Sequence, residues 1–338
     1  MDYGDIIKDI TSGNYAPVYF LQGDEPFFID NIISHIEKNA LDETQKSFNQ
    51  YVLYGKEVEM SQIMTTAKQF PMMGDRQVVI VKEAQEIRGW TKELNQNLLL
   101  DYLNNPLAST ILAFAYKYKS LDKRTKIGKE LEKKSVFLHS KKIYDNQVPN
   151  WIMTYAQARK VQISNKAVML LSENIGNNLQ RLSNEIEKLL LNLKEGESID
   201  ENAIHRYVGI SKEYNIFELQ SALSSGNQKK AQQIVKFFAS NPSNNPLVLT
   251  IFNLFSYFNK LLLAHSSSQK DKQTIARVIG VHPFFAEEYI RALRQYSLPI
   301  VLRNIQFIRD ADLASKGVNQ LVPSEEDLLK ELIFKLMN

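Results

Sequence analysis

The chain has 338 residues, of which 44% are hydrophobic and 23% are charged, and these values are typical of a globular protein rather than a disordered one. Because a single core stops growing near about 250–300 residues, the length predicts two or three domains, and we expect three. The absence of cysteine excludes disulfides, thiolate nucleophiles and cysteine-ligated metal centres. The 41 Lys and Arg residues against 38 Asp and Glu leave a net charge of +3, so any basic surface is local.

No stretch approaches the roughly 18 uninterrupted apolar residues of a membrane span. The N-terminus, Met1-Asp2-Tyr3-Gly4-Asp5, is acidic where a signal peptide would be basic. We therefore expect a cytoplasmic protein with no membrane partner.

The first 140 or so residues alternate short β-branched and aromatic runs with helix-length amphipathic segments. This pattern is typical of βαβ units around a mostly parallel sheet. Apolar residues at helical spacing predict a helix over residues 27–36, and residues 123–134 are charged and compatible with a helix. The predicted strands are residues 18–21, 51–54, 78–81, 111–114 and 136–138.

After Pro149 the strand patterns end, and the apolar residues keep a 3.6-residue period to Asn338. We therefore predict an all-helical second half. An apolar stripe over residues 179–193 belongs to a small helical module, and a break at residues 209–212 leads into a longer bundle. The amphipathic segments of that bundle are residues 245–265, 283–294, 298–315 and 324–337.

The turn after the first predicted strand is where a phosphate loop would lie, because parallel α/β folds hold nucleotide phosphates there. A phosphate loop needs Gly-x4-Gly-Lys-Ser/Thr, whereas this turn has Gly23 followed by the carboxylates of Asp24 and Glu25, which would repel a triphosphate. The third strand continues as Lys82-Glu83, where acidic residues would organise magnesium. Both positions argue against nucleotide hydrolysis.

Neither a metal site nor a catalytic set is indicated elsewhere. The five histidines have no His-x3-His or His-Glu-x2-His spacing, and no Gly-x-Ser-x-Gly elbow occurs. Most Asp and Glu residues have Lys or Arg three or four positions away, which is typical of solvated helix faces.

Two flexible apolar residues, Met72 and Met73, follow Phe70-Pro71 and precede the turn before the third predicted strand. Two interpretations are open. The pair is a core plug between a helix end and its sheet, or it is a protruding apolar knob that fits the pocket of a partner.

Residues 117–142 contain ten Lys or Arg residues and three acidic ones. Lys123, Arg124 and Lys126 in this basic stretch are candidates for contact with DNA or with an acidic neighbouring subunit. The alternative is a solubilising helix face.

The ordered set of motifs resembles, from end to end, the delta subunits of bacterial DNA polymerase III, which open the clamp in the sliding-clamp loader. The motifs are PVYFLQGDE (17–25), FPMMGDRQVVIV (70–81), DKRTK (122–126), NEIEKL (184–189), IARVIGVHPF (275–284) and ADLASKG (311–317).

This resemblance implies α/β plus all-α architecture in three domains. Residues 1–144 form a degenerate AAA+ domain with a parallel sheet that carries the clamp-binding element, 145–211 a small helical lid, and 212–338 a helical collar for oligomerisation. It implies no cofactor and no catalysis by the subunit itself, although the family is grouped with DNA-directed DNA polymerase, a nucleotidyltransferase, as part of the holoenzyme.

The implied partners are the sliding clamp (beta subunit), the tau/gamma and delta-prime loader subunits, and primer–template DNA inside the assembled loader. An apolar pair in the family inserts into the clamp, and it maps here onto Met72 and Met73, beside Phe70. Two other functions stay open, an active AAA+ ATPase with an atypical site and a stand-alone DNA-binding protein led by the basic stretch.

Overall fold

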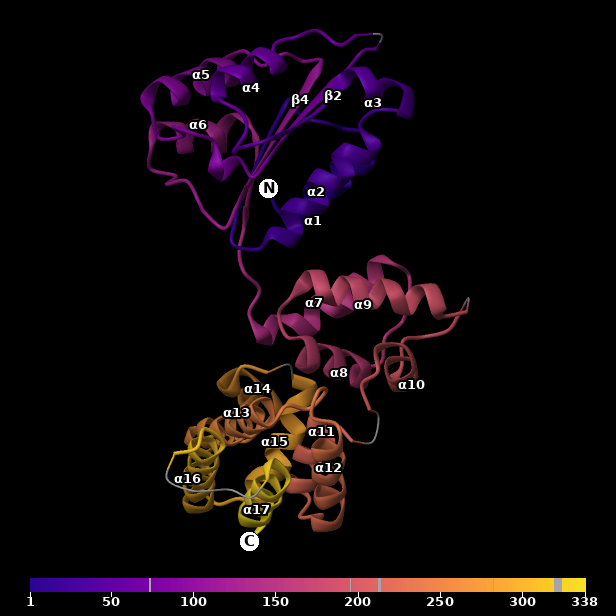
Figure 1. The fold of residues 1–338 in the computed structure, drawn as a ribbon, viewed down its shortest axis with the longest axis vertical. Coiled ribbons are helices and arrows are strands. Elements are labelled where there is room, and N and C mark those ends of the chain that lie inside the picture. Colours follow the sequence, from indigo (N-terminus) through magenta and orange to yellow (C-terminus); the bar gives the residue numbers. More distant parts are fainter. Residues whose placement is uncertain (73, 195, 212–213, 282, 319–323) are drawn as a thin grey trace. The chain divides into compact units, whose positions relative to one another are not determined.

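The computed structural model describes residues 1–338 except 73, 195, 212–213, 282 and 319–323 (Figure 1). The chain divides into two compact units, Met1–Ile143 and Tyr144–Asn338. The predicted lid and collar both lie in the second unit, so the boundary at residue 211 stays a prediction.

The first unit is built on a five-stranded parallel sheet with the strand order β2-β3-β4-β1-β5 (Figure 1). All five predicted strands are confirmed, each extended by one to four residues. Val18 of the first strand pairs with Leu112 of the fourth, and Val79 of the third pairs with the same Leu112 on its other side. The strands are β1 (Val18–Gly23), β2 (Gln50–Tyr54), β3 (Gln77–Lys82), β4 (Thr110–Lys117) and β5 (Val136–Ser140).

Helices cover both faces of this sheet (Figure 1). Alternate residues of β3 point to opposite faces, so Val78 and Ile80 pack with α1 and α2, whereas Val79 and Val81 pack with α4, α5 and α6. The burial of both faces explains the uninterrupted apolar runs of the strands. The helices are α1 (Tyr3–Thr11), α2 (Pro26–Asn39), α3 (Glu43–Asn49), α4 (Met60–Ala67), η1 (Ala84–Glu86), α5 (Glu93–Asn104) and α6 (Lys126–Lys134).

Helix α6 begins three residues later than the helix-compatible stretch of residues 123–134. Thr125 caps the helix, because its hydroxyl accepts a hydrogen bond from Gly128 N–H at 3.2 Å. Asp122 Oδ1 accepts from Arg124 N–H at 2.9 Å and closes a tight turn before the cap. Local side-chain bonds therefore hold residues 122–124 outside the helix.

The second unit is helical, as predicted. Its described residues contain no β-strand, and one isolated bridge joins Ile163 to Ile199. The helices are η2 (Asp145–Gln147), α7 (Val148–Ala158), α8 (Asn165–Ile175), α9 (Leu179–Asn192), α10 (Glu201–Ala203), η3 (Ile204–Val208), α11 (Ile216–Ser224), α12 (Gln228–Ser240), α13 (Leu247–Ser266), α14 (Lys272–Ile279), α15 (Pro283–Gln295), α16 (Leu298–Ser315) and α17 (Glu325–Met337).

One described helix, α13, is long and apolar enough to cross a membrane by length and composition alone. The core helix of a bundle passes the same test. Leu254, Phe258 and Leu261 of α13 are buried inside the second unit, whereas Val248, Phe252 and Phe255 of the same helix are exposed.

Candidate functional site

The connection between α4 and β3 carries the apolar segment singled out in the sequence. Phe70 is 76% exposed and Met72 is 61% exposed, although both side chains are large and apolar. The interpretation of Met72 as a core plug is therefore wrong. Met73 lies outside the described residues. All strands of a parallel sheet begin at one edge, so this connection lies at the amino edge of the sheet.

Buried polar side chains hold the start of this connection. Gln77, the first residue of β3, donates from Nε2 to the carbonyl of Gln69 at 2.5 Å and to Thr110 Oγ1 at 2.7 Å. Thr110 in turn donates from Oγ1 to the carbonyl of Ala67, the last residue of α4, at 3.0 Å. These bonds satisfy carbonyls that the end of a helix leaves without partners.

Asn49, the last residue of α3, holds the connection at Met72. The main-chain N–H of Met72 donates to Asn49 Oδ1 at 2.6 Å, and Asn49 Nδ2 donates to the main-chain carbonyl of Met72 at 2.6 Å. The sequence gives no sign of this role of Asn49, because its partner lies 23 residues further along the chain. The side chain of Met72 is left exposed while its main chain is fully bonded.

At the opposite edge of the sheet, the turn after β1 is closed by the end of β5. The carbonyl of Ser140 accepts from Asp24 N–H at 2.9 Å, and the Ser140 hydroxyl donates to the carbonyl of Glu25 at 2.6 Å. Gly23 has φ +132°, and a Cβ at this position would lie 1.9 Å from the carbonyl oxygen of Ser140. Only glycine fits this approach.

The N-terminus of α2, which would face a bound phosphate, is capped by Glu25. This carboxylate is 7% exposed, and its Oε1 accepts from Phe27 N–H at 3.2 Å. Burial raises the pKa of Glu25, and the Phe27 N–H and the charge of Lys142 oppose that rise. A negative group of the chain itself therefore occupies the place of an anion.

Two lysines at the carboxyl ends of β3 and β4 form ion pairs with α2. Lys82 Nζ of β3 lies 2.9 Å from Glu37, and Lys117 Nζ of β4 lies 2.6 Å from Asp30. These contacts use the cations of this edge to hold α2 against the sheet.

The basic stretch is partly neutralised within the chain. Lys123 lies 2.5 Å from Glu132, and Arg124 lies 2.8 Å from Asp122, whose pKa this contact lowers to about 2. Lys126 lies on the first turn of α6. The proposed contacts of Lys123, Arg124 and Lys126 with DNA or a subunit stay a prediction.

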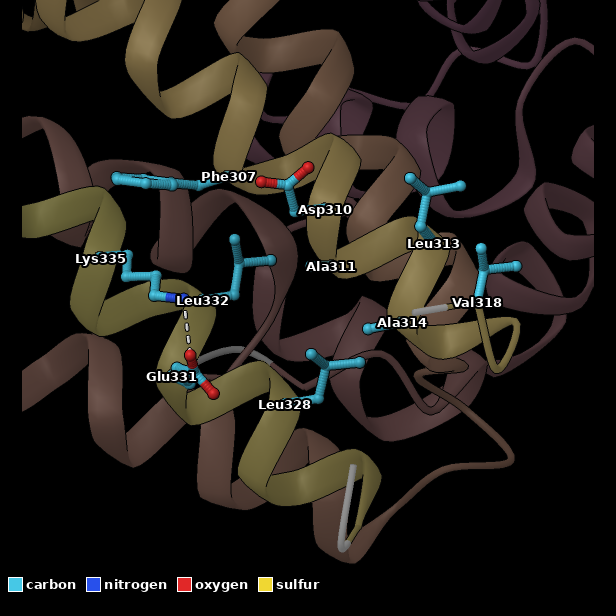
Figure 2. Close-up of a pocket in the computed structure, with 10 residues that line it drawn as sticks. All are labelled: Phe307, Asp310, Ala311, Leu313, Ala314, Val318, Leu328, Glu331, Leu332 and Lys335. Carbon is cyan, nitrogen blue, oxygen red and sulfur yellow. Dashed lines mark ion pairs between the residues drawn. The ribbon is translucent and has the colours of Figure 1, made fainter. Parts of the chain in front are cut away.

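No group of three metal-ligating side chains is assembled among the described residues, which exclude His282. A hollow of about 180 Å³ lies between α16 and α17 (Figure 2). Two of the charged residues around it form an ion pair, with Lys335 Nζ 2.6 Å from Glu331. The ten residues around this hollow are Phe307, Asp310, Ala311, Leu313, Ala314, Val318, Leu328, Glu331, Leu332 and Lys335. Most of them are apolar, which is typical of a gap in helix packing.

Comparison with known proteins gives the family. The model of "DNA polymerase III, delta subunit" matches residues 19–141, and the model of its C-terminal domain matches residues 213–331. The curated DNA polymerase III subunit delta of Bacillus subtilis is 26% identical over 310 residues, which are 89% of this chain and 89% of that protein.

A solved structure of the Bacillus subtilis DNA clamp loader delta protein has the same fold, with a TM-score of 0.58, 24% identity and 99% of each chain covered. The fold class is thus confirmed as a parallel α/β unit followed by helices, and the two family models assign the chain to the DNA polymerase subunits. It belongs to the family of DNA polymerase III delta subunits.

Proposed function

We propose that this subunit binds and opens the ring-shaped sliding clamp for loading on primed DNA, with Phe70, Met72 and Met73 as its clamp-binding segment. The observation that carries the proposal is the exposure of Phe70 and Met72 on a connection whose main chain is held by buried residues. Exposed apolar side chains at a fixed position are typical of the central contacts of protein interfaces.

Ring opening by this route needs no bond chemistry. A protein shifts an equilibrium toward the open ring when it binds the open ring more tightly than the closed one. Burying one Phe or Met side chain contributes about 1.5–3 kcal/mol, so Phe70 and Met72 together provide about 3–6 kcal/mol. If the open ring alone receives those contacts, the ratio of open to closed rings rises roughly a hundredfold or more, since 1.4 kcal/mol is a factor of ten in an equilibrium constant.

We infer that the subunit has no ATP site of its own and is not a catalyst. The closure of the Gly23–Glu25 turn by Ser140, together with the capping of α2 by Glu25, supports this inference. The same contacts weigh against an active ATPase. The ion pairs of Lys123 and Arg124 weigh against a stand-alone DNA-binding protein, since paired cations have less charge to offer phosphates.

The proposed partners are the beta clamp, the tau/gamma and delta-prime subunits, and primer–template DNA within the assembled loader. Family membership supports them, because a delta subunit functions in the polymerase holoenzyme. A cytoplasmic location, with the replicating chromosome, follows from the same role.

The test is calorimetric binding of the chain to the sliding clamp of the same organism, without nucleotide. We expect binding by the wild type and loss of detectable binding by the Met72→Ala/Met73→Ala variant, because hot-spot side chains contribute about 2 kcal/mol or more each. Leu94→Ala in α5 is the matched control, because Leu94 is 73% exposed in the same unit but lies on a helix, outside the connection between α4 and β3.

Equal binding by the wild type and the double Met variant would contradict the assignment of the segment. A large fall in melting temperature of the variant would show instead that Met73 supports the core. If the wild type fails to bind alone, the measurement is repeated with the full loader and ATP. Binding in the loader would show that the segment is masked in the free subunit, and no binding in the loader would show that the proposed function is wrong.

A further inference from the structure

Asn49 has an unusual position for a buried polar residue. Asn49 is 1% exposed, yet both polar atoms of its side-chain amide are bonded to one residue, Met72, of a connection in which the Phe70 and Met72 side chains are exposed. The Asn49 side chain thus hydrogen-bonds both the N–H and the C=O of the Met72 main chain, as a neighbouring β-strand would.

The sheet topology explains why these two residues meet. Strands β2 and β3 are parallel neighbours, with Gln50 paired to Val78. The residues that precede the two strands therefore come together at the amino edge of the sheet. Asn49 precedes β2 directly, and Met72 lies five residues before β3.

We propose that Asn49 is the positioning residue of the clamp-binding segment: it holds the main chain at Met72 in the conformation that binds the clamp. This inference rests on the proposed function. The network of Gln77 and Thr110 fixes the start of the connection, but it reaches no further than Gln69. Between Gln69 and β3, Asn49 is the described side chain that hydrogen-bonds the main chain of the apolar residues.

The physical gain is preorganisation. A connection that is already ordered loses less conformational entropy when it binds, so the same apolar contacts yield a higher affinity. Exposed apolar side chains on a free loop would also fold back onto the protein. Because the main chain of Met72 is bonded to Asn49, the Met72 side chain cannot fold back onto the protein without the loss of two buried hydrogen bonds.

The test compares Asn49→Ala and Asn49→Asp with the wild type in clamp binding. We expect each variant to weaken binding about tenfold, mainly through faster dissociation, with hydrogen exchange accelerated at the Met72 amide and unchanged at Ile80 in the core of β3. Asn304→Asp is the matched control, because Asn304 is also buried and donates from Nδ2 to a main-chain carbonyl, that of Leu336, at 3.0 Å. This control is expected to keep wild-type clamp affinity.

A change of pH separates positioning from general stability. In Asn49→Asp, burial favours the protonated carboxyl, which regains a donor for the Met72 carbonyl as the pH falls. The difference in clamp affinity between Asn49→Asp and the wild type therefore narrows from about pH 8 to about pH 5.5. The difference between Asn49→Ala and the wild type stays constant over the same range.

Two results overturn the inference alone: wild-type affinity in Asn49→Ala with faster exchange at Met72, or weaker binding with exchange accelerated equally at Met72 and Ile80. No clamp binding by the wild type, in the full loader as well, overturns the proposed function instead, and the exchange rate at Met72 then still reports whether Asn49 holds the segment.

Discussion

Two connections at opposite edges of one sheet use their atoms in opposite ways. In the turn after β1, the main chain bonds to Ser140 and the side chain of Glu25 caps its own helix, so both kinds of group have partners inside the unit. In the connection before β3, the main chain of Met72 bonds to Asn49 and the side chains of Phe70 and Met72 are exposed.

This difference shows what each edge can still bind. Phosphate recognition uses free main-chain N–H groups at the start of a helix, and the turn after β1 has given those groups to the chain itself. Protein recognition uses free side chains on a fixed main chain, and the connection before β3 keeps both. One fold has thus closed the edge typical of nucleotide sites and presents an apolar surface at the other.

The largest expected effect comes from opening the closed turn with Gly23→Ala. The added Cβ would overlap the Ser140 carbonyl, and the positive φ disfavours any side chain, so the variant should lose about 2–5 kcal/mol of stability. Urea unfolding followed by Trp90 fluorescence in a Trp151→Phe background measures this loss in the first unit.

Gly13→Ala is the control for Gly23→Ala, because Gly13 also has a positive φ, +79°, but no atom within 4 Å of its added Cβ. Equal losses in the two variants would contradict the close approach to Ser140. The folded fraction of Gly23→Ala should keep its clamp affinity, since the two connections lie at opposite edges of the sheet.

A smaller effect is expected from Glu25→Gln. The pKa of Glu25 is raised in the folded state, so the folded chain binds a proton more readily than the unfolded chain does, and wild-type stability falls as pH rises from about 4.5 through the folded pKa. The Gln variant lacks this decline and should be the more stable protein at pH 8. Urea titrations at pH 4, 6 and 8 measure the difference, and a variant that is less stable at pH 8 would contradict the assigned cost of burying the carboxylate.

The smallest expected effect is that of MgATP on the chain alone, which should leave the melting temperature unchanged. A nucleotide at about 100 times its Kd would add about 2.7 kcal/mol to stability, so binding would be easily detected. A clear rise in melting temperature would refute the proposed absence of an ATP site. The fully assembled loader, with its other subunits, is the positive control.

The architecture could be predicted from the sequence because the central strands β1, β3 and β4 are buried on both faces. The continuous apolar runs at residues 18–21 and 78–81 can be recognised as strands without a pattern of alternating apolar and polar residues, since turns and polar residues bound them. The expected start of α6 lies three residues before the observed one, because Lys123 and Arg124 suit a helix and the cap of Thr125 depends on local hydrogen bonds.

The site was less accessible to sequence analysis. The wrong residues for a phosphate loop are visible at Gly23–Glu25, but its closure by Ser140 depends on the pairing of β1 with β5, more than a hundred residues apart. A Met at position 72 is compatible with a core and with a protruding surface, so its exposure could be seen only in the structure. An Asn at the end of a helix is common, and nothing in the sequence marks Asn49 as a partner of Met72.

Both hydrogen bonds from Asn49 end on main-chain atoms, which every residue type except proline can supply at position 72. The support that Asn49 provides therefore does not depend on which side chain is present at position 72. Under the proposed function, residue 72 can therefore change together with the pocket of the sliding clamp while the fold beneath it stays the same. An engineered subunit could then be given the side chains that another sliding clamp prefers without redesign of the residues that support them.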